Sequence, residues 1–79
     1  MNPRVTAVAP RNDFILEVIF TNQERKLFDV KPYLDKGIFR ELRNREVFNS
    51  VKVDNGSISW NGGQDFGPDT LYIDGRKIN

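Results

Sequence analysis

The chain has 79 residues, and its 12 basic and 11 acidic side chains nearly cancel to a net charge of +1. This length predicts a single domain, residues 1–79, with a thin core, and the charge balance argues against the strong positive field of a DNA-binding module. The absence of cysteine and histidine excludes disulfides, zinc sites built on those residues and Ser-His-Asp or Cys-His catalysis. We therefore expect no metal and no cofactor. No apolar run resembles a signal peptide or a membrane span, so we expect a cytoplasmic protein without a membrane partner.

Three β-strands are predicted in the first third of the chain. Residues 4–10, "RVTAVAP", are rich in strand formers and are followed by the turn residues Asn12 and Asp13. The next strand, "FILEVIF" at 14–20, and the returning "RKLFDV" at 25–30 form a hairpin around "TNQE". Four apolar side chains alternate out of phase with the main apolar set and predict a second apolar face that binds a partner: Ile15, Ile19, Phe28 and Val30. The alternative is a more curled sheet that covers this face itself.

The main helix is predicted in "LDKGIFRELRNREVF", residues 34–48. Asp35 is a suitable N-cap, Glu41 and Arg45 are spaced for an ion pair, and we expect the helix to end near Asn44. Basic side chains on or after this helix form a candidate patch for nucleic acid or an acidic partner: Lys36, Arg40, Arg43 and Arg45. A solvated helix face, neutralised by nearby glutamates, is the alternative interpretation.

A second hairpin is predicted in "VKVDNGSISW", residues 51–60. Asn55-Gly56 is the preferred pair for a two-residue type I′ turn, because both positions require positive φ. This turn sets Val53 opposite Ile58 and Val51 opposite Trp60, so that all four side chains share one face. Turn chemistry and hydrophobic pattern thus predict the same register.

The stretch "WNGGQDFGPDTLYIDG", residues 60–75, predicts a loop and a short helix. Pro68 suits the first turn, Asp65 or Gly67 could cap it, and Gly75 would end it. We expect a structural clasp in which the helix docks Leu71 or Tyr72 on the indole; its residues are Trp60, Asp65, Pro68, Asp69, Leu71 and Tyr72. The alternative is a small binding site, or an enzyme that uses the Asp65 and Asp69 carboxylates with Asp74 nearby.

Taken in order, the elements β-β-β-α-β-β-α predict an α+β fold with a small, mostly antiparallel sheet, one main helix and a short C-terminal helix. The sequence resembles the bacterial DUF2442 family, a domain of unknown function. The matching stretches are "VIFTNQERKLFDVKPYL", "GIFRELRNREVFNSVKV" and "ISWNGGQDFGPDTLY", and the ending of the last is the most specific. The resemblance implies an α+β fold, no assigned catalytic residues and, for some members, a toxin–antitoxin-like pairing with a neighbouring small protein.

Three functions are compatible with these observations. The first is a small, non-enzymatic module that binds a protein partner or a second copy of itself, in the manner of the antitoxin half of a bacterial pair. The alternative is a regulator that associates with nucleic acid through the basic patch, although direct binding is not expected from so neutral a chain. An enzyme using Asp65 and Asp69 is the third.

Overall fold

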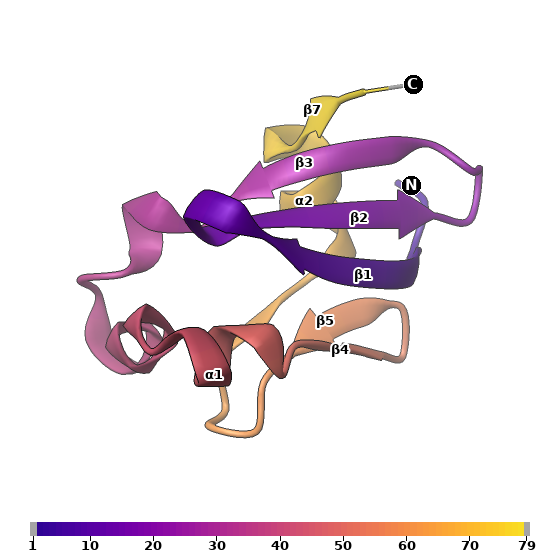
Figure 1. Cartoon of the computed structure of the whole chain (residues 1–79). Helices are drawn as coiled ribbons and strands as arrows, with labels where there is room; N and C mark the ends of the chain where they lie inside the picture. The colour runs from indigo at the N-terminus through magenta and orange to yellow at the C-terminus, as the bar shows by residue number, and fades with distance from the viewer. Residues whose placement is uncertain (1, 79) are drawn as a thin grey trace.

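Antiparallel strands dominate the computed structural model, which describes residues 2–78 (Figure 1). One sheet has the order β1-β2-β3-β7 and consists of β1 (Val5–Arg11), β2 (Ile15–Phe20), β3 (Arg25–Asp29) and β7 (Arg76–Lys77). The other has the order β4-β5-β6 and consists of β4 (Lys52–Asp54), β5 (Ser57–Ser59) and β6 (Asp65–Phe66). The predicted α+β class is confirmed. The strands form two sheets rather than one, and the two-residue strands β6 and β7 had no counterpart in the sequence prediction.

The predicted main helix is divided into two elements. Residues Gly37–Arg43 form a 3₁₀ helix, η3, and the α-helix α1 covers Arg45–Asn49. Asn44 lies between them with extended backbone, and its side chain accepts a hydrogen bond from the Glu46 amide as the N-cap of α1. The predicted helix end near Asn44 is thus the end of η3, and the same residue caps the start of α1. The cap expected at Asp35 is wrong too, because η3 begins after Lys36 without a side-chain cap.

Shorter turns complete the chain. Two further 3₁₀ helices cover Asn12–Phe14 (η1) and Lys31–Tyr33 (η2). The C-terminal helix α2 covers Pro68–Asp74, with Pro68 in its first turn and Gly75 at its end, as predicted. Its N-cap is Gly67 and Asp65 belongs to β6, so Asp65 does not cap it.

The hairpin of β4 and β5 has the register that the Asn55-Gly56 pair predicted. Val53 lies opposite Ile58 and Asp54 opposite Ser57, and the two turn residues have φ of 52° and 82°. The predicted apolar face is not buried throughout: Ile58 is fully buried, whereas Val53 is 38% exposed. The turn also joins the two sheets, because the Val5 amide donates to the Gly56 carbonyl.

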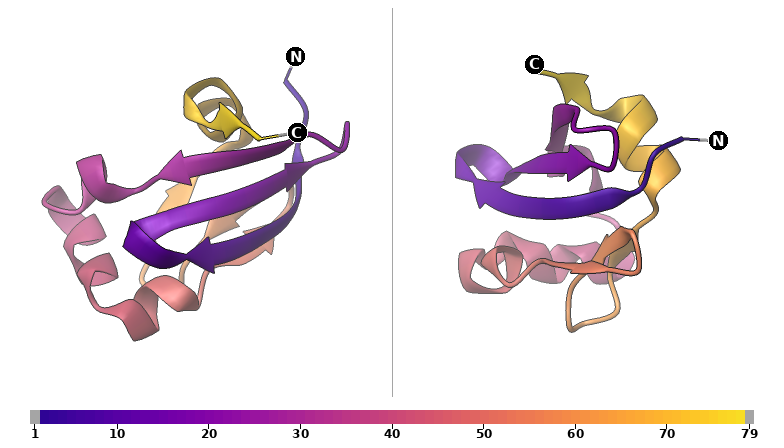
Figure 2. Two further views of the ribbon diagram at one scale, coloured as in Figure 1. Left: turned by 45° about the horizontal axis from the view of Figure 1, so that its top comes forward. Right: turned by 90° about the vertical axis from the view of Figure 1, so that its right-hand side faces the viewer.

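The core lies between the inner face of the four-stranded sheet and the remaining elements. Helix α2 runs behind β2 and β3 (Figure 1), and the right-hand view of Figure 2 shows α1 and the β4–β5 hairpin in a layer beneath β1. Alternate residues of β2 enter this core and are buried: Leu16, Val18 and Phe20. No helix crosses the opposite face of the sheet in these views, which leaves β2 covered on one side only.

Phe28 and Val30 are corrections to the predicted second apolar face. Phe28 pairs with Leu16 across β2 and β3 and is 2% exposed, and Val30 is completely buried. Directly opposed residues share a face of a sheet, so this register directs Phe28 into the core and Leu27 outward. Ile15 and Ile19, which alternate with the core residues, keep the outward orientation that was expected.

Candidate functional site

The uncovered side of the four-stranded sheet is the first candidate surface, and we call it the outer face. The strand register defines its members, which lie opposite one another on neighbouring strands: Ala7, Ala9, Arg11, Ile15, Glu17, Ile19, Arg25, Leu27, Asp29 and Arg76. Ile78 adjoins them through the hydrogen bond from its amide to the Arg25 carbonyl. The face therefore combines aliphatic side chains with a row of charged ones.

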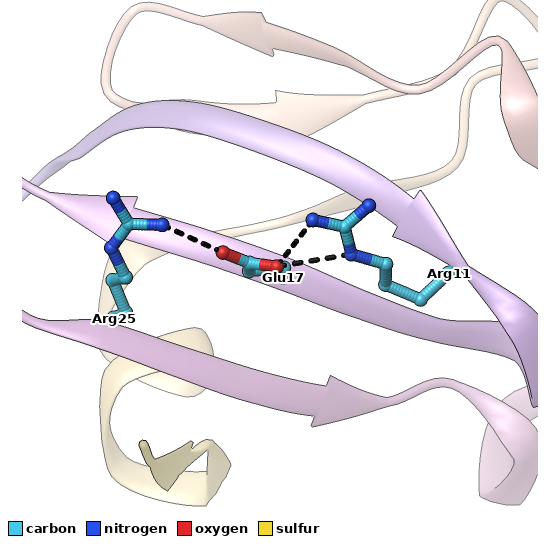
Figure 3. A network of polar contacts seen from close by, with 3 residues as sticks. All are labelled: Arg11, Glu17 and Arg25. Carbon is cyan, nitrogen blue, oxygen red and sulfur yellow. Dashed lines mark hydrogen bonds and ion pairs between the residues drawn. The ribbon is translucent and has the colours of Figure 1, made fainter. Parts of the chain in front are cut away.

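Glu17 stands at the centre of the outer face, between two arginines from the flanking strands (Figure 3). Arg11 donates to Glu17 Oε1 from Nε at 3.0 Å and from Nη2 at 2.6 Å, and Arg25 Nη1 donates to Oε2 at 3.0 Å. The glutamate side chain is only 14% exposed, whereas the arginine side chains are 56% and 50% exposed. The carboxylate thus lies under the two guanidinium groups, which face the solvent.

The Arg11 hydrogen bond holds the pKa of Glu17 below its ordinary value, with further lowering from the Arg25 hydrogen bond and from both charges, against an opposing effect of burial. A carboxylate that stays ionised keeps both guanidinium groups in place at neutral pH. The sequence analysis missed this group, because its three members are separated along the chain and meet only through the register of β1, β2 and β3.

The predicted basic patch is reduced to three members. Lys36, Arg40 and Arg43 are exposed, and the last two are three residues apart on η3, a spacing that places them on one side of a 3₁₀ helix. Arg45 is a correction: its guanidinium carbon lies 4.8 Å from the Phe48 ring centre, and Nη2 donates to the Arg11 carbonyl at 3.1 Å. Arg45 therefore fastens α1 to β1, and it does not contribute a free charge to the patch.

An open hollow of about 780 Å³ lies beside this patch. Its wall comes from η3, α1 and the loop after β5: Arg40, Glu41, Asn44, Glu46, Val47, Ser50, Asn61 and Gly62. Several of these groups are already engaged. Glu41 accepts from Gln64, the Asn44 oxygen caps α1, and Asn61 accepts from Lys52. The hollow accordingly presents few unengaged polar groups to a ligand.

Gln64 is the buried polar residue that the sequence analysis missed. It is fully buried, and its Nε2 donates to the Ile38 carbonyl at 2.7 Å and to Glu41 Oε1 at 2.8 Å. The loop containing it is held to η3 by these bonds. A Cβ on Gly62 would come within 2.5 Å of Glu41 Oε1, so an alanine there would displace the carboxylate that accepts from Gln64. From the sequence, residues 62–64 indicated only a loop, and nothing in the pattern predicted that Gln64 would be buried.

Trp60 closes the core, but its partners differ from those expected. The indole Nε1 donates to the Phe48 carbonyl at 2.9 Å, and the Phe48 and Phe66 rings lie 6.2 and 6.0 Å away. Tyr72 instead packs edge-on against Phe20, with ring centres 5.1 Å apart. Phe66 therefore takes the place on the indole that Tyr72 was expected to occupy, because β6 brings it beside β5. Leu71 is fully buried, as a clasp requires.

Tyr72 forms a second polar contact across the fold. Its hydroxyl donates to Glu24 Oε1 at 2.5 Å, and Lys26 Nζ lies 3.7 Å from the centre of its ring. The hydrogen bond lowers the pKa of Glu24 and raises the pKa of Tyr72. This contact joins α2 to the β2–β3 hairpin, which is a structural role.

The aspartates of the C-terminal stretch are dispersed. Asp65 is exposed on β6, Asp69 is exposed in the first turn of α2 and accepts from Asn2 at 3.3 Å, and Asp74 is exposed at the helix end. Neither Asp65 nor Asp69 lines the hollow described above. Within residues 2–78 no cluster of three or more acidic side chains is arranged to hold a metal ion, and no helix there is long and apolar enough to cross a membrane.

Comparison with known proteins gives a single result. The family model described as "Protein of unknown function (DUF2442)" matches residues 5–76, which is most of the chain. Searches of curated proteins and of solved structures found no significant match. The matched range runs from β1 to β7 and so includes both sheets and the outer face. The chain belongs to the DUF2442 family.

Proposed function

We propose that the protein is a small, non-enzymatic module that binds another protein through the outer face of its four-stranded sheet. The observation that carries the proposal is the asymmetry of this sheet. Its inner face packs on the core, while its outer face holds the partly exposed Ile15, Ile19 and Leu27. No helix crosses that face in Figures 1 and 2. Apolar side chains gathered on an uncovered face are typical of interaction surfaces.

The size of the molecule is compatible with this role. A stable interface buries about 800 Å² on each partner. The described part of the chain exposes 4758 Å² in total, so such an interface would occupy about one sixth of its surface. A role as the antitoxin-like half of a pair, acting in the cytoplasm, is consistent with a module that binds a protein through its outer face.

Replacement of Ile19 by lysine tests the proposal. Ile19 is partly exposed, so a lysine can extend into solvent and the fold should survive. The matched control is Ile73→Lys on α2, where the side chain is 69% exposed and lies away from the outer face. We expect the wild type and Ile73→Lys to retain a stoichiometric protein companion from the native host, and Ile19→Lys to lose it while its melting curve stays cooperative. Equal retention by all three proteins would contradict the proposal.

A nucleic-acid-associated role is the second candidate, and one observation favours it. The 3₁₀ helix η3 directs Arg40 and Arg43 to one side with Lys36 nearby. Phosphate contacts of this kind would weaken steeply with salt. Loss of bound nucleic acid in Arg43→Gln, with no effect of Ile19→Lys, would favour this role over the first.

A further inference from the structure

The outer face has an excess of positive charge. It carries three arginines, Arg11, Arg25 and Arg76, and two acids, of which Glu17 pairs with Arg11 and Arg25. Its other acid, Asp29, is 3.1 Å from Lys31 Nζ and so is neutralised locally. With the Asp29–Lys31 pair set aside, three arginines against one glutamate leave two net positive charges, and the other side chains of this face are aliphatic. The whole chain carries only +1, so the excess is a property of this face.

From this charge and geometry we infer that the outer face binds a protein surface with an aliphatic stripe flanked by carboxylates. The inference rests on the proposed protein-binding role and specifies the chemistry of the partner. Arg11 and Arg25 would each meet a partner carboxylate, while Ile15, Ile19 and Leu27 would pack against its aliphatic side chains. Arginine suits this task because its planar donor group matches a carboxylate.

Glu17 is a positioning residue in this arrangement. Its two oxygens accept from the two arginines, one oxygen for each, and they hold the guanidinium groups about the centre of the face before any partner arrives. Groups that are already ordered lose less conformational entropy on binding. The side-chain exposures of 56% for Arg11 and 50% for Arg25 show that this pairing leaves a large part of each guanidinium-bearing side chain at the surface.

A second copy of the chain is a poorer occupant than an acidic protein. Two outer faces brought together would oppose two surfaces of the same net charge, and like charges across an interface are unfavourable. Nucleic acid is also acidic, but single strands bind where aromatic side chains stack on bases. The outer face, as the strand register defines it, carries aliphatic side chains and no aromatic one.

The test uses the purified full chain and a defined probe. The probe is a fluorescently labelled synthetic amphipathic helix of about five turns, with a leucine stripe flanked by glutamates. A peptide with lysines in place of the glutamates and a labelled single-stranded oligonucleotide serve as comparisons. We expect saturable fluorescence anisotropy with the glutamate helix, a weaker response to added salt than nucleic acid would give, and no binding of the lysine helix.

Matched variants connect the binding to the outer face. Arg11→Gln should weaken binding of the glutamate helix about tenfold, the loss expected when one charge-assisted contact is removed. Arg43→Gln makes the same charge change at an exposed site on η3 and should leave the affinity unchanged. An equal effect of both substitutions would show a general charge effect and overturn the inference. So would binding of the oligonucleotide in preference to the peptide, or no binding of the glutamate helix.

A last arm separates this inference from the proposed function. The companion captured from the native host is compared for Ile19→Lys and Arg11→Gln. Loss of the companion in both variants supports a partner that needs the aliphatic and the charged groups together. Loss in Ile19→Lys with full retention in Arg11→Gln would overturn the acidic partner while the protein-binding role stands. Sedimentation of the free chain should show a monomer, and a dimer that Arg11→Gln strengthens would identify a second copy as the occupant and overturn the inference.

Discussion

Replacement of Trp60 by phenylalanine separates the two contributions of the indole to stability. Phenylalanine keeps an aromatic ring between Phe48 and Phe66, but it cannot donate to the Phe48 carbonyl, which now accepts from Nε1 at 2.9 Å. Trp60 is 2% exposed and Phe48 is fully buried, so water has little access to the abandoned oxygen. An unsatisfied buried acceptor costs about 1–3 kcal/mol, and the smaller ring adds a packing loss, for a total of about 2–4 kcal/mol.

This loss is large for so small a protein. At 0.05–0.15 kcal/mol per residue, a chain of this length has an unfolding free energy of about 4–12 kcal/mol. We expect Trp60→Phe to lower the urea midpoint by about 2–4 M, since small domains have a slope near 1 kcal/mol per M. Trp60→Ala, which removes the ring as well, should cost about 3–5 kcal/mol. Far-ultraviolet circular dichroism is the assay, because Trp60 is the only tryptophan. An unchanged midpoint for Trp60→Phe would refute the assigned hydrogen bond.

Three further substitutions and one control test other parts of the structure. Gly56→Val places a β-branched residue at a φ of 82° and should cost more than about 2 kcal/mol; a chemical melt with unchanged midpoint would contradict the turn. Tyr72→Phe removes the hydrogen bond from the Tyr72 hydroxyl to Glu24, which lowers the pKa of Glu24 and raises the pKa of Tyr72. That bond adds stability which is lost as pH falls below the ordinary carboxyl value of 4.5 and as it rises above the ordinary phenol value of 10.0, so melting temperatures of the variant should depend less on pH at both ends. Gly62→Ala should cost about 0.5–1.5 kcal/mol, because its Cβ would meet Glu41 Oε1 at 2.5 Å and displace it from its hydrogen bond with Gln64. Gly67→Ala, with open space around its Cβ, should change the thermal midpoint little.

The sequence predicted best where a local rule decides the structure. Asn55 and Gly56 form a two-residue turn whose φ values depend on these two residues alone, and Pro68 with Gly75 delimits α2 for equally local reasons. Alternation along β2 likewise assigned its inward and outward residues correctly. In each case the deciding residues are adjacent or nearly adjacent in the chain.

The errors arose where the structure depends on contacts between distant segments. Phe28 was assigned to the wrong face because the register between β2 and β3 is set across a turn whose length the pattern did not fix. Strands β6 and β7 have two residues each, too few for any alternation to be visible. The helix was expected to end near Asn44, and the second helix after it was missed, because Asn44 takes extended backbone and its side chain caps α1.

Strand β2 separates the core of this small fold from the surface that we propose as the binding face. Its inward residues Leu16 and Val18 are fully buried, and Glu17 between them lies on the open face with its two arginines. Because adjacent residues point to opposite sides, a change at Glu17 or Ile19 alters the surface without removing a core side chain. A strand covered on both faces would couple binding to core packing at every position. Because β2 is covered on one side only, substitutions on the outer face can test the proposed partner binding while the core keeps the chain folded.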